Sequence, residues 1–146
     1  MKSKHGTYAL VLRSLRSTST QIGRWGRLWI VPGYYIYVGS AMGPGGIQAR
    51  VTRHCRKAKS KHWHIDYLRE HVDPVFTWYS NEPVKLEHRW AQKLSEMEDA
   101  SPVKGFGCTD CRCLSHLFFM KKKPSLERFL DAIGAPVETC VFHPDR

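Results

Sequence analysis

Acidic residues are absent from the first 65 positions of the chain, although this stretch carries 12 lysines and arginines. All 13 acidic residues of the 146-residue sequence lie from Asp66 onward, beside the other 11 basic residues. An N-terminal half with so much unbalanced positive charge repels itself, so we expect a polyanion to face it, and nucleic-acid phosphates are the commonest such partner. The alternative is a basic surface that only keeps the protein in solution.

Long apolar runs are also missing. The longest ones, at 28–31 and 117–120, fall far short of the roughly 20 residues that span a bilayer. The basic N-terminus leads into no apolar stretch of the signal-peptide kind. Five cysteines, an odd number, favour free thiols or a metal over a disulfide framework. These absences predict a soluble, cytoplasmic protein with no membrane partner.

What is present is the composition of a globular domain. Hydrophobic residues make up 42% and charged residues 25% of the sequence, and 12% are aromatic. With this length we expect a single domain over 1–146, with its core at about 6–120 and a C-terminal helix and tail at 121–146.

Apolar periodicity and turn residues predict a mixed fold. The dipeptide Pro32-Gly33 indicates a hairpin turn. The glycine-rich segment 39–46 indicates a loop that can approach a phosphate, and the polar segment 17–21 indicates another loop. Strands are predicted at 6–15, 28–31, 34–38, 75–79 and 114–120, and helices at 47–57, 62–71, 82–97 and 124–133. This order favours a small sheet covered by helices, an α+β or sandwich-like α/β domain.

Two tyrosine motifs on predicted strands, GTY at 6–8 and YVG at 37–39, precede a helix with Arg50 and His54 one turn apart. With the segments GYYIYVGSA, GPGG, RVTRH, KHWHIDYL and GFGCTDCRCLSHLF, the sequence resembles the GIY-YIG nuclease superfamily. It is most similar to the small stand-alone Uri-type endonucleases, a branch long filed as a domain of unknown function. The resemblance covers Gly6 to about Phe119.

The resemblance implies a fold and an activity. The fold would be a three-stranded, largely antiparallel sheet flanked by helices, and the activity metal-dependent hydrolysis of DNA phosphodiester bonds with one Mg²⁺ or Mn²⁺. The catalytic residues that it implies are Tyr8, Tyr37, Arg50, His54 and Glu87, with Glu87 as the metal ligand. Either tyrosine could deprotonate the attacking water.

The chemistry of these residues agrees with that assignment. Arg50 offers a permanently charged fork for two phosphate oxygens. A phenol with an ordinary pKa of about 10 is a poor base at neutral pH, so a nearby cation would have to lower that pKa. His54, with an ordinary pKa of about 6.5, is a partner or a rival for the base role. Each tyrosine could also be a core residue of its strand.

The metal ligand must come from the second half of the chain, because the first half has no carboxylate. Glu87 lies beside the apolar stripe of its predicted helix, and one carboxylate with water and substrate phosphate is typical of Mg²⁺. Glu82 and Asp66 are substitutes, and a solvated Glu87 is the alternative. The asparagine that some superfamily members use late in the fold has no clear counterpart here.

Other polar residues are candidates for DNA binding or metal binding. We expect phosphate contacts from Ser40, Arg53, Arg56, Lys57, Lys59 and Lys61. The His62, His64 and Asp66 pattern resembles a metal face only on a strand, so a structural hydrogen-bonding role is preferred.

The cysteine loop offers zinc ligands in Cys108, Cys111, Cys113 and His116. Their tight spacing favours free thiols over a single tetrahedral site, unless Cys140 or His143 contributes a ligand. The main hypothesis is therefore a Mg²⁺-dependent DNA endonuclease. The alternative is a non-catalytic nucleic-acid-binding module with a basic face and a zinc site, and RNA remains open as a partner.

Overall fold

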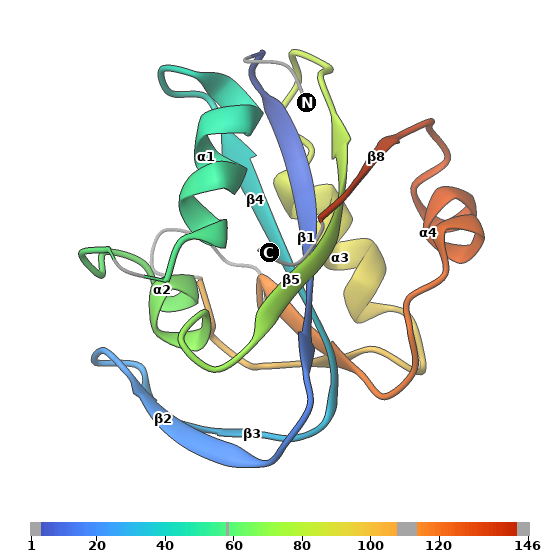
Figure 1. Cartoon of the computed structure of the whole chain (residues 1–146). Helices are drawn as coiled ribbons and strands as arrows, with labels where there is room; N and C mark the ends of the chain where they lie inside the picture. The colour runs from blue at the N-terminus through green and yellow to red at the C-terminus, as the bar shows by residue number, and fades with distance from the viewer. Residues whose placement is uncertain (1–3, 58, 108–113, 143–146) are drawn as a thin grey trace.

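A computed structural model describes residues 4–57, 59–107 and 114–142 (Figure 1). Its main sheet has six strands in the order β6-β7-β4-β1-β5-β8, and every neighbouring pair is antiparallel. The strands are β1 (Gly6–Ser14), β2 (Thr18–Ile22), β3 (Gly26–Ile30), β4 (Gly33–Ala41), β5 (Asp73–Ser80), β6 (Ser101–Pro102), β7 (Leu117–Met120) and β8 (Glu138–Val141). The helices are α1 (Gly46–Cys55), α2 (His64–Leu68), α3 (Glu87–Ser95) and α4 (Leu126–Ile133).

The α+β class is confirmed, but the expected three-stranded sheet is wrong, because the sheet has six strands. β4, β1 and β5 form its centre, β7 and β6 extend it on one side and β8 on the other. The two outermost strands are only two and four residues long. Such short polar segments show no alternation, which is why the sequence did not predict them.

The predicted hairpin of 28–31 with 34–38 is also wrong. β3 pairs with β2 in a separate two-stranded sheet, while β4 pairs with β1 along its whole length. β2 was not predicted, because Ile22 is the only buried residue of this strand and its polar sequence is typical of a loop. Pro32 and Gly33 therefore link two sheets instead of turning one hairpin.

The helices follow the predicted places with shorter bounds. α1 begins directly after the glycine-rich loop, where Gly45 takes a left-handed φ of 82° that glycine adopts without strain. α2 and α3 are shorter than the predicted 62–71 and 82–97, and α4 ends as predicted at Ile133, with Gly134 as its C-cap. No helix in the described ranges is both long and apolar enough to cross a membrane.

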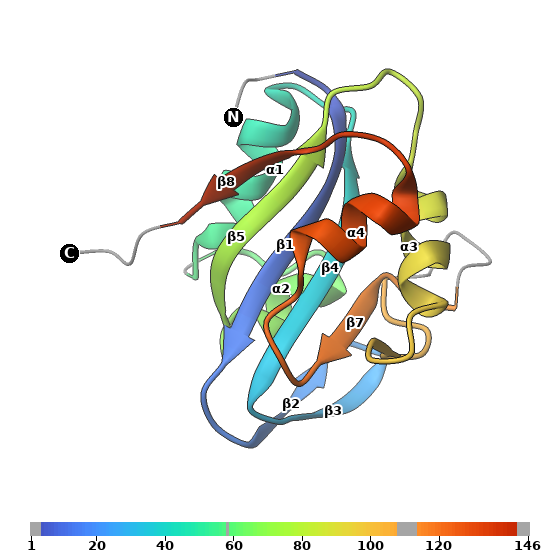
Figure 2. The same ribbon diagram turned by 90° about the vertical axis from the view of Figure 1, so that its right-hand side faces the viewer.

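The sheet separates two apolar cores. Alternate residues of β1 point to opposite faces, so Tyr8 and Leu10 pack under α1 and α2, whereas Ala9 and Val11 pack under α3 and α4. The β2–β3 hairpin adds its buried residues to the α1 and α2 side. Figure 1 shows the sheet almost edge-on between these layers, and Figure 2 looks onto the α3 and α4 side.

Candidate active site

The two motif tyrosines lie on neighbouring strands under α1. Tyr8 of β1 and Tyr37 of β4 have ring centroids 6.4 Å apart. In the β1–β4 register Tyr8 is opposite Gly39, and a Cβ at residue 39 would overlap the Tyr8 hydroxyl. The glycine of the YVG motif therefore makes the space that the phenol of the GTY motif occupies.

Tyr8 is hydrogen-bonded to His54 from α1. The hydroxyl oxygen lies 2.7 Å from Nε2 of His54, and both residues are only 1% exposed. Burial, together with the positive charge of Lys59, lowers the pKa of His54 to about 3, so the imidazole is neutral at pH 7. Burial also raises the pKa of Tyr8 well above its usual value, and the charge of Arg50 opposes this shift. The phenol thus holds its proton beside a neutral imidazole.

Arg50 approaches the same phenol from the previous turn of α1. A hydrogen bond from its side chain lowers the pKa of Tyr8, and its Nη1 lies 3.5 Å from the carbonyl oxygen of Ser40. Its guanidinium also stacks on the indole of Trp63, with Cζ 4.5 Å from the ring centroid. Arg50, Gly43 and Pro44 line a hollow of about 180 Å³ in front of α1.

Glu87 reaches this place from the other side of the sheet, as the first residue of α3. Its Oε1 accepts a hydrogen bond from Oγ of Ser40 at 2.8 Å, and its Oε2 lies 3.0 Å from Nδ1 of His116. Burial raises the pKa of the carboxyl, but the hydrogen bonds from His116 and Ser40 outweigh burial and lower it. The carboxylate is therefore ionised at neutral pH, and 21% of the side chain remains exposed.

The topology explains why these groups meet. Within β4, only Tyr34–Tyr37 pair with β7. The rest of that edge of β4, up to Ala41, extends beyond β7. α1 packs on one face of the sheet and α3 on the other, and Ser40 at this edge contacts both Arg50 and Glu87. All five residues expected in the catalytic site are thus brought together.

His116 is a site residue that the sequence suggested only as a zinc ligand. Its Nδ1 lies near Oε2 of Glu87 and 3.3 Å from the carbonyl oxygen of Val38, and the residue is buried. No spacing rule could have found this contact, because the two residues belong to segments that meet only in the fold.

Residues 7–138 match the family model described as "Domain of unknown function DUF123". The chain belongs to the DUF123 family. No curated protein and no solved structure matched it. The family description assigns no activity, so the interpretation of this DUF123 site depends on its residues.

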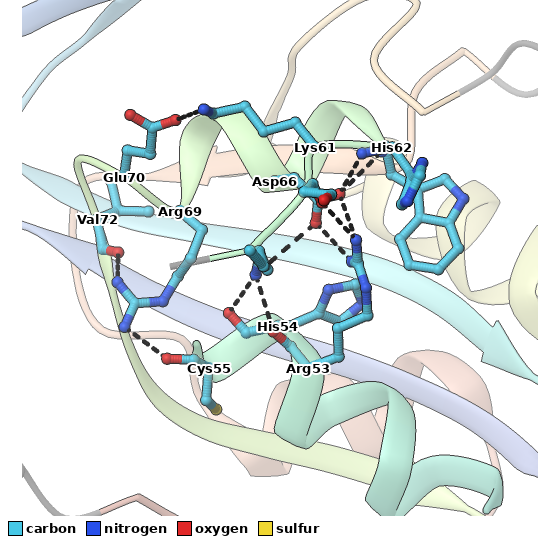
Figure 3. Close-up of polar contacts among 12 residues, drawn as sticks. Arg53, His54, Cys55, Lys61, His62, Asp66, Arg69, Glu70 and Val72 are labelled. Atoms are coloured by element: carbon cyan, nitrogen blue, oxygen red, sulfur yellow. Dashed lines mark hydrogen bonds and ion pairs between the residues drawn. The ribbon is translucent and has the colours of Figure 1, made fainter. Parts of the chain in front are cut away.

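Asp66 organises the basic segment behind the site (Figure 3). Its carboxylate accepts hydrogen bonds from Nη1 and Nη2 of Arg53 at 2.8 and 3.0 Å, and from the backbone N–H of His62 and Trp63. Burial raises the pKa of Asp66, but these bonds outweigh it and bring the pKa to about 2. The structural hydrogen-bonding role expected for Asp66 agrees with these contacts.

Of the residues expected to contact DNA, Ser40 donates a hydroxyl hydrogen bond to Glu87, and the five basic residues divide into two groups. Arg53 and Lys59 are held in the structure, since Arg53 pairs with Asp66 and Nζ of Lys59 donates to the carbonyl oxygen of Arg53 at 2.8 Å. Arg56, Lys57 and Lys61 lie on the surface, although Lys61 pairs with Glu70 at 2.6 Å. Only the surface residues are open to a phosphate without breaking a buried contact.

The zinc prediction falls mostly outside the described residues, because Cys108, Cys111 and Cys113 lie there. His62, His64 and Asp66 do not form a metal site, since Nδ1 of His64 accepts a hydrogen bond from the backbone N–H of Gly107 at 2.9 Å. Within 4–57, 59–107 and 114–142 no group of three or more His, Cys, Asp or Glu could hold a metal ion.

Proposed function

We propose that this DUF123 protein is a metal-dependent endonuclease of the GIY-YIG type that hydrolyses DNA phosphodiester bonds. The observation that carries the proposal is the convergence of Arg50, the Tyr8–His54 pair and Glu87 at the edge of β4. In-line attack on a phosphodiester needs a proton acceptor, a fixed cation and a carboxylate that can hold a metal. These groups supply one of each.

The donor set fits one Mg²⁺ or Mn²⁺. Glu87 is ionised and partly exposed, with Oε1 bound to Ser40 and Oε2 beside His116, and a carboxylate has about four lone-pair sites, so it can also hold a cation. A single carboxylate completed by water and substrate phosphate is usual for Mg²⁺. When bound there, the metal would stabilise negative charge on the leaving oxygen.

The side chains of the chain would divide the remaining work. Arg50, which carries a permanent charge, would bind the scissile phosphate and stabilise the charge that develops on it. Tyr8 would donate its proton to Nε2 of His54 as it takes one from the attacking water. Burial disfavours the imidazolium that results, so the negative charge of the bound phosphate would have to stabilise it. Tyr37, more exposed than Tyr8, would contact the substrate beside them.

Nicking of supercoiled plasmid tests the proposal. The wild-type protein should nick the plasmid with Mg²⁺ or Mn²⁺ and not with EDTA, and Arg50→Ala should slow nicking about 100-fold or more. Arg128→Ala is the matched control, because Arg128 is an exposed arginine of α4 that pairs with Asp99. It should nick at the wild-type rate.

Metal binding gives a second readout that does not depend on cleavage. Titration with Mn²⁺, followed by its electron paramagnetic resonance, should show one site in the wild type that Glu87→Gln weakens. A wild-type protein that binds plasmid but never nicks it would overturn the proposal and favour the non-catalytic binding module.

A further inference from the structure

The β2–β3 hairpin has one buried face and one exposed face. Along β3, Leu28 and Ile30 point into the core, while Arg27 and Trp29 point outward. Trp29 is 72% exposed, and its neighbour across the hairpin is Ser19. A large indole is thus presented to solvent on a surface whose inner side is fully packed.

The segment that carries Trp29 has charge of one sign. Residues 13–31 contain four arginines and no acidic residue, and all four arginines are exposed: Arg13, Arg16, Arg24 and Arg27. Arg27 lies on the same face as Trp29 and donates a hydrogen bond to Oγ of Ser19 at 3.1 Å. An exposed aromatic ring beside cations is suited to a polyanion that also offers flat rings, which describes unpaired nucleotides.

The hairpin tip is linked to the candidate active site through aromatic contacts. Trp25 packs on Phe106 with centroids 6.0 Å apart, and Phe106 packs on Tyr37 with centroids 6.3 Å apart. Gly23 lies against the ring of Tyr67 from α2, and Figure 1 shows the hairpin curving beneath α2. From the tip, the outer face of β3 continues to Trp29 over about 10 Å, at roughly 3.3 Å per residue.

We propose that the outer face of the β2–β3 hairpin binds a single-stranded segment of DNA, with Trp29 stacked on an unpaired base and Arg24 and Arg27 on the backbone phosphates. The choice of DNA rests on the proposed function, which the hairpin extends to substrates with an unpaired segment. Duplex DNA would not satisfy Trp29, because the faces of paired bases are covered by stacking. The surface therefore selects for strand separation and not for a base sequence.

Binding without catalysis tests the surface. Fluorescence anisotropy of the full chain in EDTA would compare a labelled single strand of about 20 nucleotides with a blunt duplex of the same sequence. Trp29→Ala should weaken binding of the single strand about tenfold and leave duplex binding almost unchanged. Trp29→Phe should restore most of the affinity, because it keeps an aromatic face.

Leu15→Ala is the matched control, since Leu15 is a similarly exposed hydrophobic residue at 73%. It should bind the single strand as the wild type does, and circular dichroism should show that every variant is folded. Arg24→Gln with Arg27→Gln should weaken binding and reduce its dependence on salt concentration.

The hairpin proposal is overturned if the wild type does not bind the single strand, or if Trp29→Ala binds it normally. An equal loss of binding to the duplex overturns it as well. Its fate is separate from that of the nuclease proposal, because EDTA prevents cleavage. A protein that nicks no plasmid but loses single-strand binding on Trp29→Ala keeps the hairpin proposal and rejects the nuclease.

Discussion

The two faces of the central sheet differ in what they bury. Under α3 and α4, aromatic rings fill the core, with Trp78 stacked on Phe129 at 4.7 Å and Trp90 edge-on to Phe129 at 5.2 Å. Under α1 and α2, the core also contains ionisable groups, namely His54, Asp66 and Arg69. Apart from Glu87 at the start of α3, one face resembles an ordinary hydrophobic core, while the other holds polar groups in fixed positions.

This difference indicates how stability and chemistry are divided. Buried polar groups cost free energy unless they are satisfied, so a fold keeps them where each has a partner. Apolar packing on the far face stabilises the sheet that carries β1 and β4. Substitutions on the two faces should therefore have different consequences.

Trp90→Ala should have the largest effect on stability, and it should not change DNA binding by the folded protein. Trp90 is fully buried under α4, so its removal leaves a cavity and should lower the free energy of unfolding by about 4 kcal/mol. Urea unfolding measures the loss. Per folded molecule, DNA binding at low temperature should equal that of the wild type, and a specific loss of binding would contradict the division between the faces.

Asp66→Ala should affect both stability and the site. It removes the partner of Arg53 and Lys59 and two backbone hydrogen bonds, so we expect a loss of about 3 kcal/mol in the free energy of unfolding. DNA binding per folded molecule should also change, because Arg53 packs on the same indole as Arg50.

Asp99→Ala is the control for Asp66→Ala, since its carboxylate pairs with Arg128 at the surface. Unfolding should show no measurable change for this variant. If the free energy of unfolding fell as little in Asp66→Ala as in Asp99→Ala, the hydrogen bonds of Asp66 would not stabilise the fold.

The smallest effect in this series is a pH dependence confined to the α1 face. The pKa of His54 is about 3 in the folded protein and about 6.5 when unfolded, so the unfolded chain binds the extra proton first as pH falls. Its contribution is complete above pH 6.5 and declines below it. The free energy of unfolding should therefore be about 2 kcal/mol lower at pH 5 than at pH 7.

Unfolding curves of His54→Gln check this assignment. The variant should lose most of the dependence between pH 7 and 5, whereas Trp90→Ala should keep it. Asp66, with a pKa of about 2, titrates below this range. An unchanged slope in His54→Gln would assign the dependence to other histidines.

Much of the fold could be predicted from the sequence where hydrophobic patterning is strong. β1, β4, α1 and α4 lie close to their expected places because their apolar residues alternate or repeat at helical spacing. β2, β6 and β8 were missed because they are short and polar, and they are held by pairing with partners that no local pattern identifies.

The site was predictable only as far as motifs reach. The segments that contain Tyr8, Tyr37, Arg50 and His54 carry recognisable motifs. Glu87 was predicted because it lies beside the apolar stripe of its helix. A hydrogen-bonding role was expected for Asp66, but its pairing with Arg53 carries no signature in the sequence. The contact between His116 and Glu87 could not be predicted either, because the two residues belong to distant segments that meet only in the fold.

The overlap between Tyr8 and residue 39 makes two separate motifs behave as one unit. A side chain on the second motif would push the phenol of the first away from the imidazole, even though neither the phenol nor the imidazole had changed. Gly39→Ala should therefore imitate the loss of Tyr8, and trimming the aromatic ring at position 8 should make alanine at 39 tolerable again. Evolution would be expected to alter these positions jointly or leave both alone.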